Sequence, residues 1–258
     1  MKASAVLTLT ARSGGPVPQP DFEIYGDALL NVFGLQAMSP TRASVGEWNG
    51  GEGTMLTTQP GDANIAGSGA SERCDLTLGV SGSYGNQGQH EWWAVDFLFP
   101  SNGWHELPMS PANAQPWYFQ LAGIEFHNSA SGSGQANVQT IVYPPTGSDP
   151  GRNTGMYCTL SYGNQNAPDK EETKIRAAPM PTDWWIRHVC ECKWSSASDG
   201  VYRLWEGASL LAEYLGPNLY PGQSVYLKLP NYHTAFGKSQ SVVYGRVARG
   251  KTRHDVEG

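Results

Sequence analysis

Residues 183–194 read DWWIRHVCECKW, and residues 198–214 continue as SDGVYRLWEGASLLAEY. In the first segment every second residue from Ile186 to Trp194 forms one largely apolar face, the pattern of a strand with one buried side. Asp199-Gly200 and then Glu206-Gly207 supply turn residues between this strand and two further short strands. Such a meander predicts an antiparallel β-sandwich or β-jelly roll.

Length and composition favour one all-β domain. The chain has 258 residues, of which only 16% are charged, together with 31 glycines and 18 prolines. Frequent turn residues and few charges suit short strands more than long helices. We expect an extended arm at 1–22, a β domain at 23–250 that holds one helical turn within 23–38, and a tail at 251–258.

Several classes of protein are disfavoured. A net charge of −6 without a basic stripe argues against nucleic acid as a partner. No apolar run approaches the roughly 20 residues that cross a bilayer. Residues 1–10 match a signal peptide poorly, because threonines interrupt their apolar stretch. The four cysteines are too few for a disulfide scaffold and lack zinc-site spacing, so we expect buried free thiols and no metal.

The candidate site begins with residues 225–232, VYLKLPNY. Side-chain alternation puts Tyr226, Lys228 and Tyr232 on the face opposite the apolar residues. An open outer face that carries a cation and two phenols suits an acidic polysaccharide. Lys228 and Tyr232 are four residues apart, or about 13 Å along a strand, unless a bulge at Pro230 shortens the distance.

Two other segments repeat this arrangement. In residues 119–127, FQLAGIEFH, Glu125 and His127 lie opposite Ile124 and Phe126. In residues 72–79, ERCDLTLG, Arg73 and Asp75 face outward. A bent jelly-roll sheet would gather these outward residues in one groove.

Arginine, lysine, histidine and tyrosine side chains supply the catalytic groups that β-elimination on a uronate requires. Removing the proton α to a carboxylate builds up negative charge, which a nearby Lys or Arg stabilises. A neutral histidine can take the proton near neutral pH, and a tyrosine hydroxyl can protonate the departing glycosidic oxygen. The reaction needs no cofactor.

Each candidate also has a structural interpretation. His127 could be a hydrogen-bonding strand residue, Arg73 an ordinary ion-pair partner of Asp75, and Lys228 a solvated edge charge. A glycosidase would instead need Glu125 and Asp75 as paired carboxylates, without the usual strand motif.

The tryptophans and His188 divide between core and surface. His188, Trp93, Trp194 and Trp205 are predicted to be core residues. Trp104 and Trp117 flank a loop and are the candidates for sugar-stacking platforms.

The order of these motifs resembles the heparin lyase I-like polysaccharide lyases over about residues 70–250. The matching segments are 73–76 (RCDL), 125–127 (EFH), 185–189 (WIRHV), 193–195 (KWS), 199–200 (DG), 204–207 (LWEG) and 226–232 (YLKLPNY). The resemblance implies a concanavalin A-like β-jelly roll that cleaves an acidic polysaccharide by elimination. It also implies that His127 is the base, that Tyr232 is the acid, and that Lys228 and Arg73 bind carboxylate or sulfate.

The departures from that family pattern bear on the substrate. Glu125 stands where the family has a neutral Gln, Asp75 where it has Glu, and Pro230 where it has Gly. An added negative charge beside the base and the scarcity of basic residues disfavour heparin, and favour either a less charged uronate polymer or a lyase fold that has lost its activity.

The alternative function is a non-catalytic glycan-binding or phage virion protein, such as a minor tail or decoration component. The arm at 1–22 and the basic segment 246–253 would then serve virion or homo-oligomer contacts. Both functions imply an extracellular or virion-associated protein.

Overall fold

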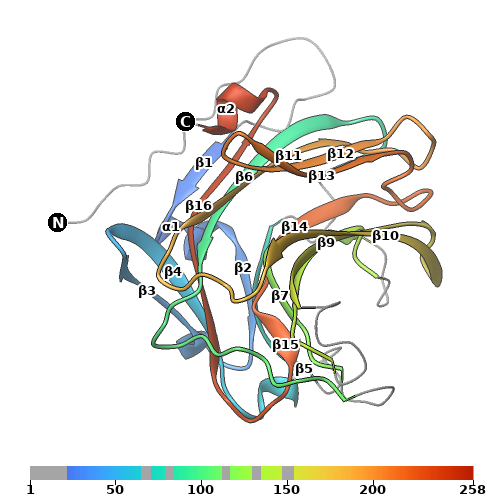
Figure 1. The fold of residues 1–258 in the computed structure, drawn as a ribbon. Coiled ribbons are helices and arrows are strands. Elements are labelled where there is room, and N and C mark those ends of the chain that lie inside the picture. Colours follow the sequence, from blue (N-terminus) through green and yellow to red (C-terminus); the bar gives the residue numbers. More distant parts are fainter. Residues whose placement is uncertain are drawn as a thin grey trace.

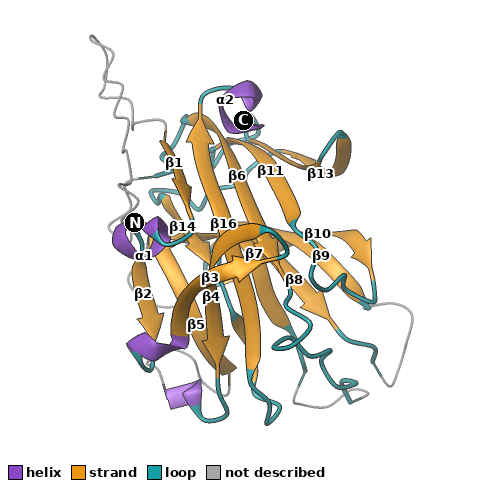
Figure 2. Ribbon diagram, turned by 90° about the vertical axis from the view of Figure 1, so that its left-hand side faces the viewer, coloured by secondary structure: helices purple, strands orange, loops and turns teal. Residues whose placement is uncertain are grey.

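The computed structural model describes residues 22–64, 71–78, 84–111, 117–129, 135–146 and 154–257. Over these ranges the chain forms two eight-stranded antiparallel sheets that pack face to face, shown in Figures 1 and 2. The predicted all-β sandwich is therefore confirmed. The proposed N-terminal arm and the weak signal-peptide match lie outside the described residues, apart from Phe22.

Sheet A has the order β13-β12-β11-β6-β16-β4-β3, with β1 paired to β16. Its strands are β1 (Phe22–Tyr25), β3 (Ala43–Trp48), β4 (Gly51–Thr58), β6 (His90–Leu98), β11 (Ile186–Lys193), β12 (Val201–Glu206), β13 (Ser209–Leu215) and β16 (Gln240–Gly250). The β11–β12–β13 meander is the one that the sequence predicts.

Sheet B has the order β10-β9-β8-β7-β14-β5-β15, with β2 paired to β5 and β15 also paired to β7. Its strands are β2 (Gly34–Ala37), β5 (Ser71–Leu78), β7 (Gln120–Asn128), β8 (Val138–Tyr143), β9 (Gly155–Asn164), β10 (Ala167–Ala177), β14 (Val225–Leu229) and β15 (Tyr232–Thr234). Strands β14 and β15 both lie between β5 and β7, on either side of Pro230. Figure 1 shows that sheet B is bent, with β9 and β10 arching over one side.

The inner faces of the two sheets share one core. Edge-to-face aromatic contacts link them, because Phe126 of sheet B packs against Trp93 and Trp194 of sheet A at centroid distances of 5.8 and 5.0 Å. His188 is fully buried beside Phe97, as predicted. The four cysteines are buried free thiols, also as predicted.

Helices are short and peripheral. They comprise α1 (Ala28–Val32), α2 (Arg253–Glu257) and two 3-10 turns, Pro40–Arg42 and Asp62–Asn64. Helix α1 confirms the helical turn expected within residues 23–38. No helix of the described ranges is long and apolar enough to span a membrane.

The C-terminal residues differ from the expected tail. Helix α2 packs on the outer face of sheet A, where Val256 is buried and Arg253 lies 5.0 Å over the Trp205 ring. Trp205 itself stacks on Trp92 on this outer side, so its prediction as sandwich core was wrong. In the basic segment, Arg246 and Arg249 are buried and paired with Glu23 and Glu91, whereas Lys251 is exposed and Arg253 is half-buried.

Candidate functional site

Six of the candidate residues lie on the outer face of sheet B: Arg73, Glu125, His127, Tyr226, Lys228 and Tyr232. Their strand neighbours Cys74, Phe126 and Leu227 point into the core, so alternation directs the candidates outward. The register pairs Tyr226 with His127, Lys228 with Glu125, and Tyr232 with Arg73. Strands β5, β7, β14 and β15 thus bring together residues that are as much as 159 positions apart in the chain, since Arg73 opposes Tyr232.

His127 and Tyr226 form the first pair in this face. Their rings are 5.3 Å apart between centroids, at an interplanar angle of 31°, and both side chains are half-buried. The His127 Nδ1 atom lies 3.0 Å from the Asn128 carbonyl oxygen, so Nδ1–H donates a hydrogen bond and Nε2 keeps a lone pair. Burial raises the pKa of Tyr226, which keeps the phenol protonated at neutral pH.

Four charged side chains form a compact cluster next to this pair. This charged quartet consists of Arg73, Asp75, Glu125 and Lys228. The Lys228 Nζ atom lies 3.0 Å from Asp75 Oδ2 and 3.6 Å from Glu125 Oε1, and Arg73 Nε lies 3.3 Å from the same Asp75 oxygen. Two cations and two carboxylates give the quartet a formal charge of zero.

Lys228 is sequestered within the quartet. Its side chain is only 5% exposed, so the alternative that it is a solvated edge charge was wrong. Burial acts against the charged amine, but the carboxylates of Asp75 and Glu125 outweigh burial and raise the pKa of Lys228 above its usual value. The ammonium group is therefore held by the protein's own carboxylates.

Arg73 and Tyr232 form the second pair. The guanidinium carbon of Arg73 lies 4.7 Å from the centre of the Tyr232 ring, and Arg73 also donates a hydrogen bond of 3.3 Å to Gln36. The Phe119 ring is 5.6 Å from the Tyr232 ring. Arg73 is thus held in a fixed position, and its side chain is 15% exposed.

His127 and Tyr232 are not paired across the strands. Tyr232 opposes Leu121, six residues before His127 on β7. The register is continuous across Pro230, since Lys228 opposes Glu125 and Tyr232 opposes Leu121, four residues further in each strand. Strand β7 is itself irregular between Leu121 and Glu125, where its pairing with β8 shifts and Gly123 has a φ of 86°. The phenol paired with His127 is Tyr226.

The two candidate platform tryptophans have different environments. Trp104 is 6% exposed and donates a hydrogen bond of 2.8 Å from Nε1 to Gln120, so its prediction as a sugar platform was wrong. It is a core residue because its loop folds back against Phe99. Trp117 is 60% exposed, and its carbonyl oxygen accepts a hydrogen bond from Thr234 of β15. It therefore lies near Tyr232 at the surface.

The outer face continues over β8, β9 and β10, which the candidate residues above do not include. Tyr143 and Tyr157 form an edge-to-face pair 5.5 Å apart, and Lys174 Nζ lies 5.8 Å from the Tyr157 ring centre. Alternation of Met156, Cys158 and Leu160 with polar residues was the sequence signal that could have revealed this extension.

The described residues do not suggest a metal centre, since they contain no group of three or more His, Cys, Asp or Glu side chains that could hold an ion. The arrangement also does not suit the glycosidase alternative. Asp75 and Glu125 both contact the ammonium group of Lys228 and are buried, whereas a glycosidase places its two carboxylates on either side of an exposed bond.

A protein-family model described as polysaccharide lyase matches residues 32–246. This chain belongs to the polysaccharide lyase family. Membership places it among enzymes of the carbon–oxygen lyase class. The match is coarser than the heparin lyase I-like group that the sequence resembles, and it confirms neither that subgroup nor a phage origin. No curated protein sequence matches the chain significantly.

Solved structures share the fold at low sequence identity. An endo-β-1,4-glucuronan lyase from the fungus Trichoderma reesei has 15% identity and a TM-score of 0.62, covering 91% of this chain and 97% of its own. The alginate lyase vAL-1 from Chlorella virus has 10% identity and a TM-score of 0.52, with coverages of 86% and 94%. A family 16 endo-glucanase from Bacteroides ovatus also has 10% identity and a TM-score of 0.52, with coverages of 89% and 99%. Because a hydrolase shares the fold as well, the chemistry must be argued from the site.

Proposed function

We propose that this lyase cleaves a uronate-containing glycan by β-elimination on the outer face of sheet B, with His127 as the base. The observation that carries the proposal is the His127–Tyr226 pair, in which an imidazole and a phenol lie 5.3 Å apart on that face. Elimination needs a base and an acid that reach the same sugar ring, and these two side chains are close enough to do so.

His127 is suited to accept the proton α to the carboxylate. Its Nδ1–H is engaged with the Asn128 carbonyl, which leaves the Nε2 lone pair for the substrate. Tyr226 then donates its proton to the departing glycosidic oxygen. The C–H and C–O bonds of the uronate break and a C=C bond forms. The imidazole gains the proton that the carbon loses, and the phenol loses the proton that the glycosidic oxygen gains. Transfer of one proton from the imidazolium to the phenolate then restores both groups, so no water is consumed.

Tyr232 and Arg73 take a different part from the one that the family resemblance implies. Tyr232 pairs with Leu121 and not with His127, and its ring lies against Arg73 and Phe119. We assign this pair to a neighbouring subsite, where Arg73 is the more exposed cation of the quartet and binds a substrate carboxylate. Lys228 instead offsets part of the negative charge of Asp75 and Glu125, which reduces the repulsion of an acidic glycan by the floor of the site.

The test is the ultraviolet absorbance of unsaturated uronate products, measured on a panel of acidic polysaccharides. We expect His127→Ala and Tyr226→Phe to lose at least 100-fold in kcat, in the range typical of a lost general acid or base. Tyr232→Phe should mainly raise KM. Loss of kcat in Tyr232→Phe with normal turnover in Tyr226→Phe would reassign the acid to Tyr232. Unchanged activity in His127→Ala would refute the proposed base.

One observation favours a second candidate, a glycan-binding protein without catalysis. The quartet has no net formal charge, Lys228 is only 5% exposed, and Arg73 is assigned to the neighbouring subsite, so the quartet offers no exposed cation at the cleaved uronate itself. Binding of an acidic glycan by wild-type protein without any new absorbance would support this candidate.

A further inference from the structure

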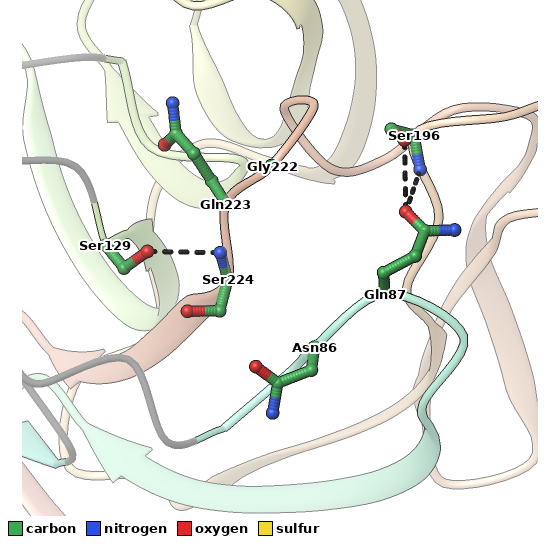
Figure 3. Close-up of a pocket in the computed structure, with 7 residues that line it drawn as sticks. All are labelled: Asn86, Gln87, Ser129, Ser196, Gly222, Gln223 and Ser224. Carbon is green, nitrogen blue, oxygen red and sulfur yellow. Dashed lines mark hydrogen bonds between the residues drawn. The ribbon is translucent and has the colours of Figure 1, made fainter.

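A polar pocket of about 480 Å³ lies one step beyond the His127–Tyr226 pair. Seven residues line it, and Figure 3 shows them around an open space: Asn86, Gln87, Ser129, Ser196, Gly222, Gln223 and Ser224. The volume falls within the roughly 300–1,000 Å³ that is usual for small-molecule sites. None of the seven side chains carries a charge.

The strand register connects this pocket to the proposed active site. Ser129 comes directly after β7 and Ser224 directly before β14, and they are joined by hydrogen bonds of 2.8 and 3.1 Å. They lie two residues further along each strand than the catalytic pair, or about 7 Å, which is close to the length of one sugar. A sugar linked to the uronate at His127 therefore reaches the pocket.

The opposite wall comes from sheet A and is held in place by its own hydrogen bonds. Gln87 donates to Ser195 Oγ at 3.0 Å and accepts from the Ser196 backbone at 2.9 Å. Asn86 is fixed through its backbone to Gln89, and neighbouring Gly85 accepts a hydrogen bond from Val225 at the start of β14. The pocket thus spans both sheets and is formed before any ligand binds.

Charge decides which sugar the pocket suits. A homopolymer of uronate carries a carboxylate on every sugar, and the residues that line the pocket offer amides and hydroxyls but no cation to pair with it. The quartet, on the other side of the His127–Tyr226 pair, adds no net positive charge. Amide and hydroxyl groups are instead good partners for the hydroxyls of an uncharged sugar.

We infer that this pocket binds an uncharged sugar linked directly to the uronate that is cleaved. The preferred glycan is then a copolymer in which uronate alternates with, or is flanked by, neutral sugars. This inference rests on the proposed lyase function and names its substrate class.

The experiment compares kcat/KM on two copolymers, hyaluronan and deacylated gellan, with kcat/KM on polyglucuronate and polymannuronate. We expect wild-type protein to favour at least one copolymer over both homopolymers at least tenfold. Asn86→Lys adds a cation to the pocket and should shift the ratio toward homopolymers by at least tenfold. Asn102→Lys adds the same charge on an exposed turn after β6, at the opposite end of that strand, and should leave the ratio unchanged.

Faster cleavage of a homopolymer, or a ratio that Asn86→Lys does not move, overturns the inference while the lyase function stands. Absence of new absorbance on all four polymers contradicts the lyase function instead. In that case the pocket is judged by the NMR signals of the Asn86 and Gln87 side-chain amides during titration with a hyaluronan tetrasaccharide. Shifts that Asn86→Lys abolishes support the pocket, and unshifted signals refute it.

Discussion

Replacing Lys228 by methionine should destabilise the protein strongly. The ammonium group lies 3.0 Å from Asp75 and 3.6 Å from Glu125, and all three side chains are buried. Methionine keeps most of the volume of lysine but leaves two buried carboxylates with one fewer cation. Breaking a buried ion pair by removing one partner typically costs about 3–5 kcal/mol. We expect a loss of that size in the free energy of unfolding.

The assay is urea unfolding at neutral pH, with Lys238→Met as the matched control because Lys238 is exposed. The control should change stability by less than about 0.5 kcal/mol. Adding Glu125→Gln to Lys228→Met removes one of the unpaired charges, so the double variant should be more stable than the sum of the single effects predicts.

The pH dependence follows from the raised pKa of Lys228. A group whose pKa is higher in the folded state contributes its full stabilisation below the unfolded pKa, here about 10.4, and loses it as the pH rises through the folded value. The difference between wild type and Lys228→Met should therefore hold through neutral pH and shrink only above about pH 10.4. A loss below about 1 kcal/mol at neutral pH would refute the account of the quartet.

Three further predictions concern other residues. Burial lowers the pKa of His188 to about 3, so protonation of this residue in the unfolded state should cost the wild type up to about 1.4 kcal/mol of stability per pH unit as the pH falls from about 6.5 to about 3. His188→Leu should lack that slope in urea unfolding, and an unchanged slope would contradict the burial. Trp117→Ala should raise KM for the glycan with an unchanged Tm, whereas Trp104→Phe should cost about 1 kcal/mol of stability through its lost hydrogen bond and leave KM unchanged; the reverse pattern would refute their placement. Cys190 and Cys192 should react with iodoacetamide only in denaturant, as followed by mass spectrometry, and rapid labelling of the native protein would contradict their burial.

Side-chain alternation along single strands was the feature of the sequence that predicted the structure best. It predicted the β11–β12–β13 meander and the outward direction of Arg73, His127 and Lys228, because a strand's side-chain period is fixed by local geometry. The family motifs gave the same residues.

The pairing between distant strands could not be predicted in this way. Which phenol meets His127 depends on how β14 aligns with β7, and a shift of a few residues would exchange Tyr226 for Tyr232. Trp104 was misplaced for a related reason, since a loop residue's burial depends on where the loop folds. The burial of Lys228 also arises only when β5, β14 and β7 are assembled.

The most direct test of the central claim is cleavage in water enriched in heavy oxygen. Elimination at the His127–Tyr226 site adds no water. Products quenched early, before the anomeric oxygen of the new reducing end exchanges with the solvent, should therefore contain no heavy oxygen at their new ends, should absorb in the ultraviolet, and should be absent with His127→Ala. Products that carry heavy oxygen and lack the absorbance would show hydrolysis, and they would contradict the proposed mechanism.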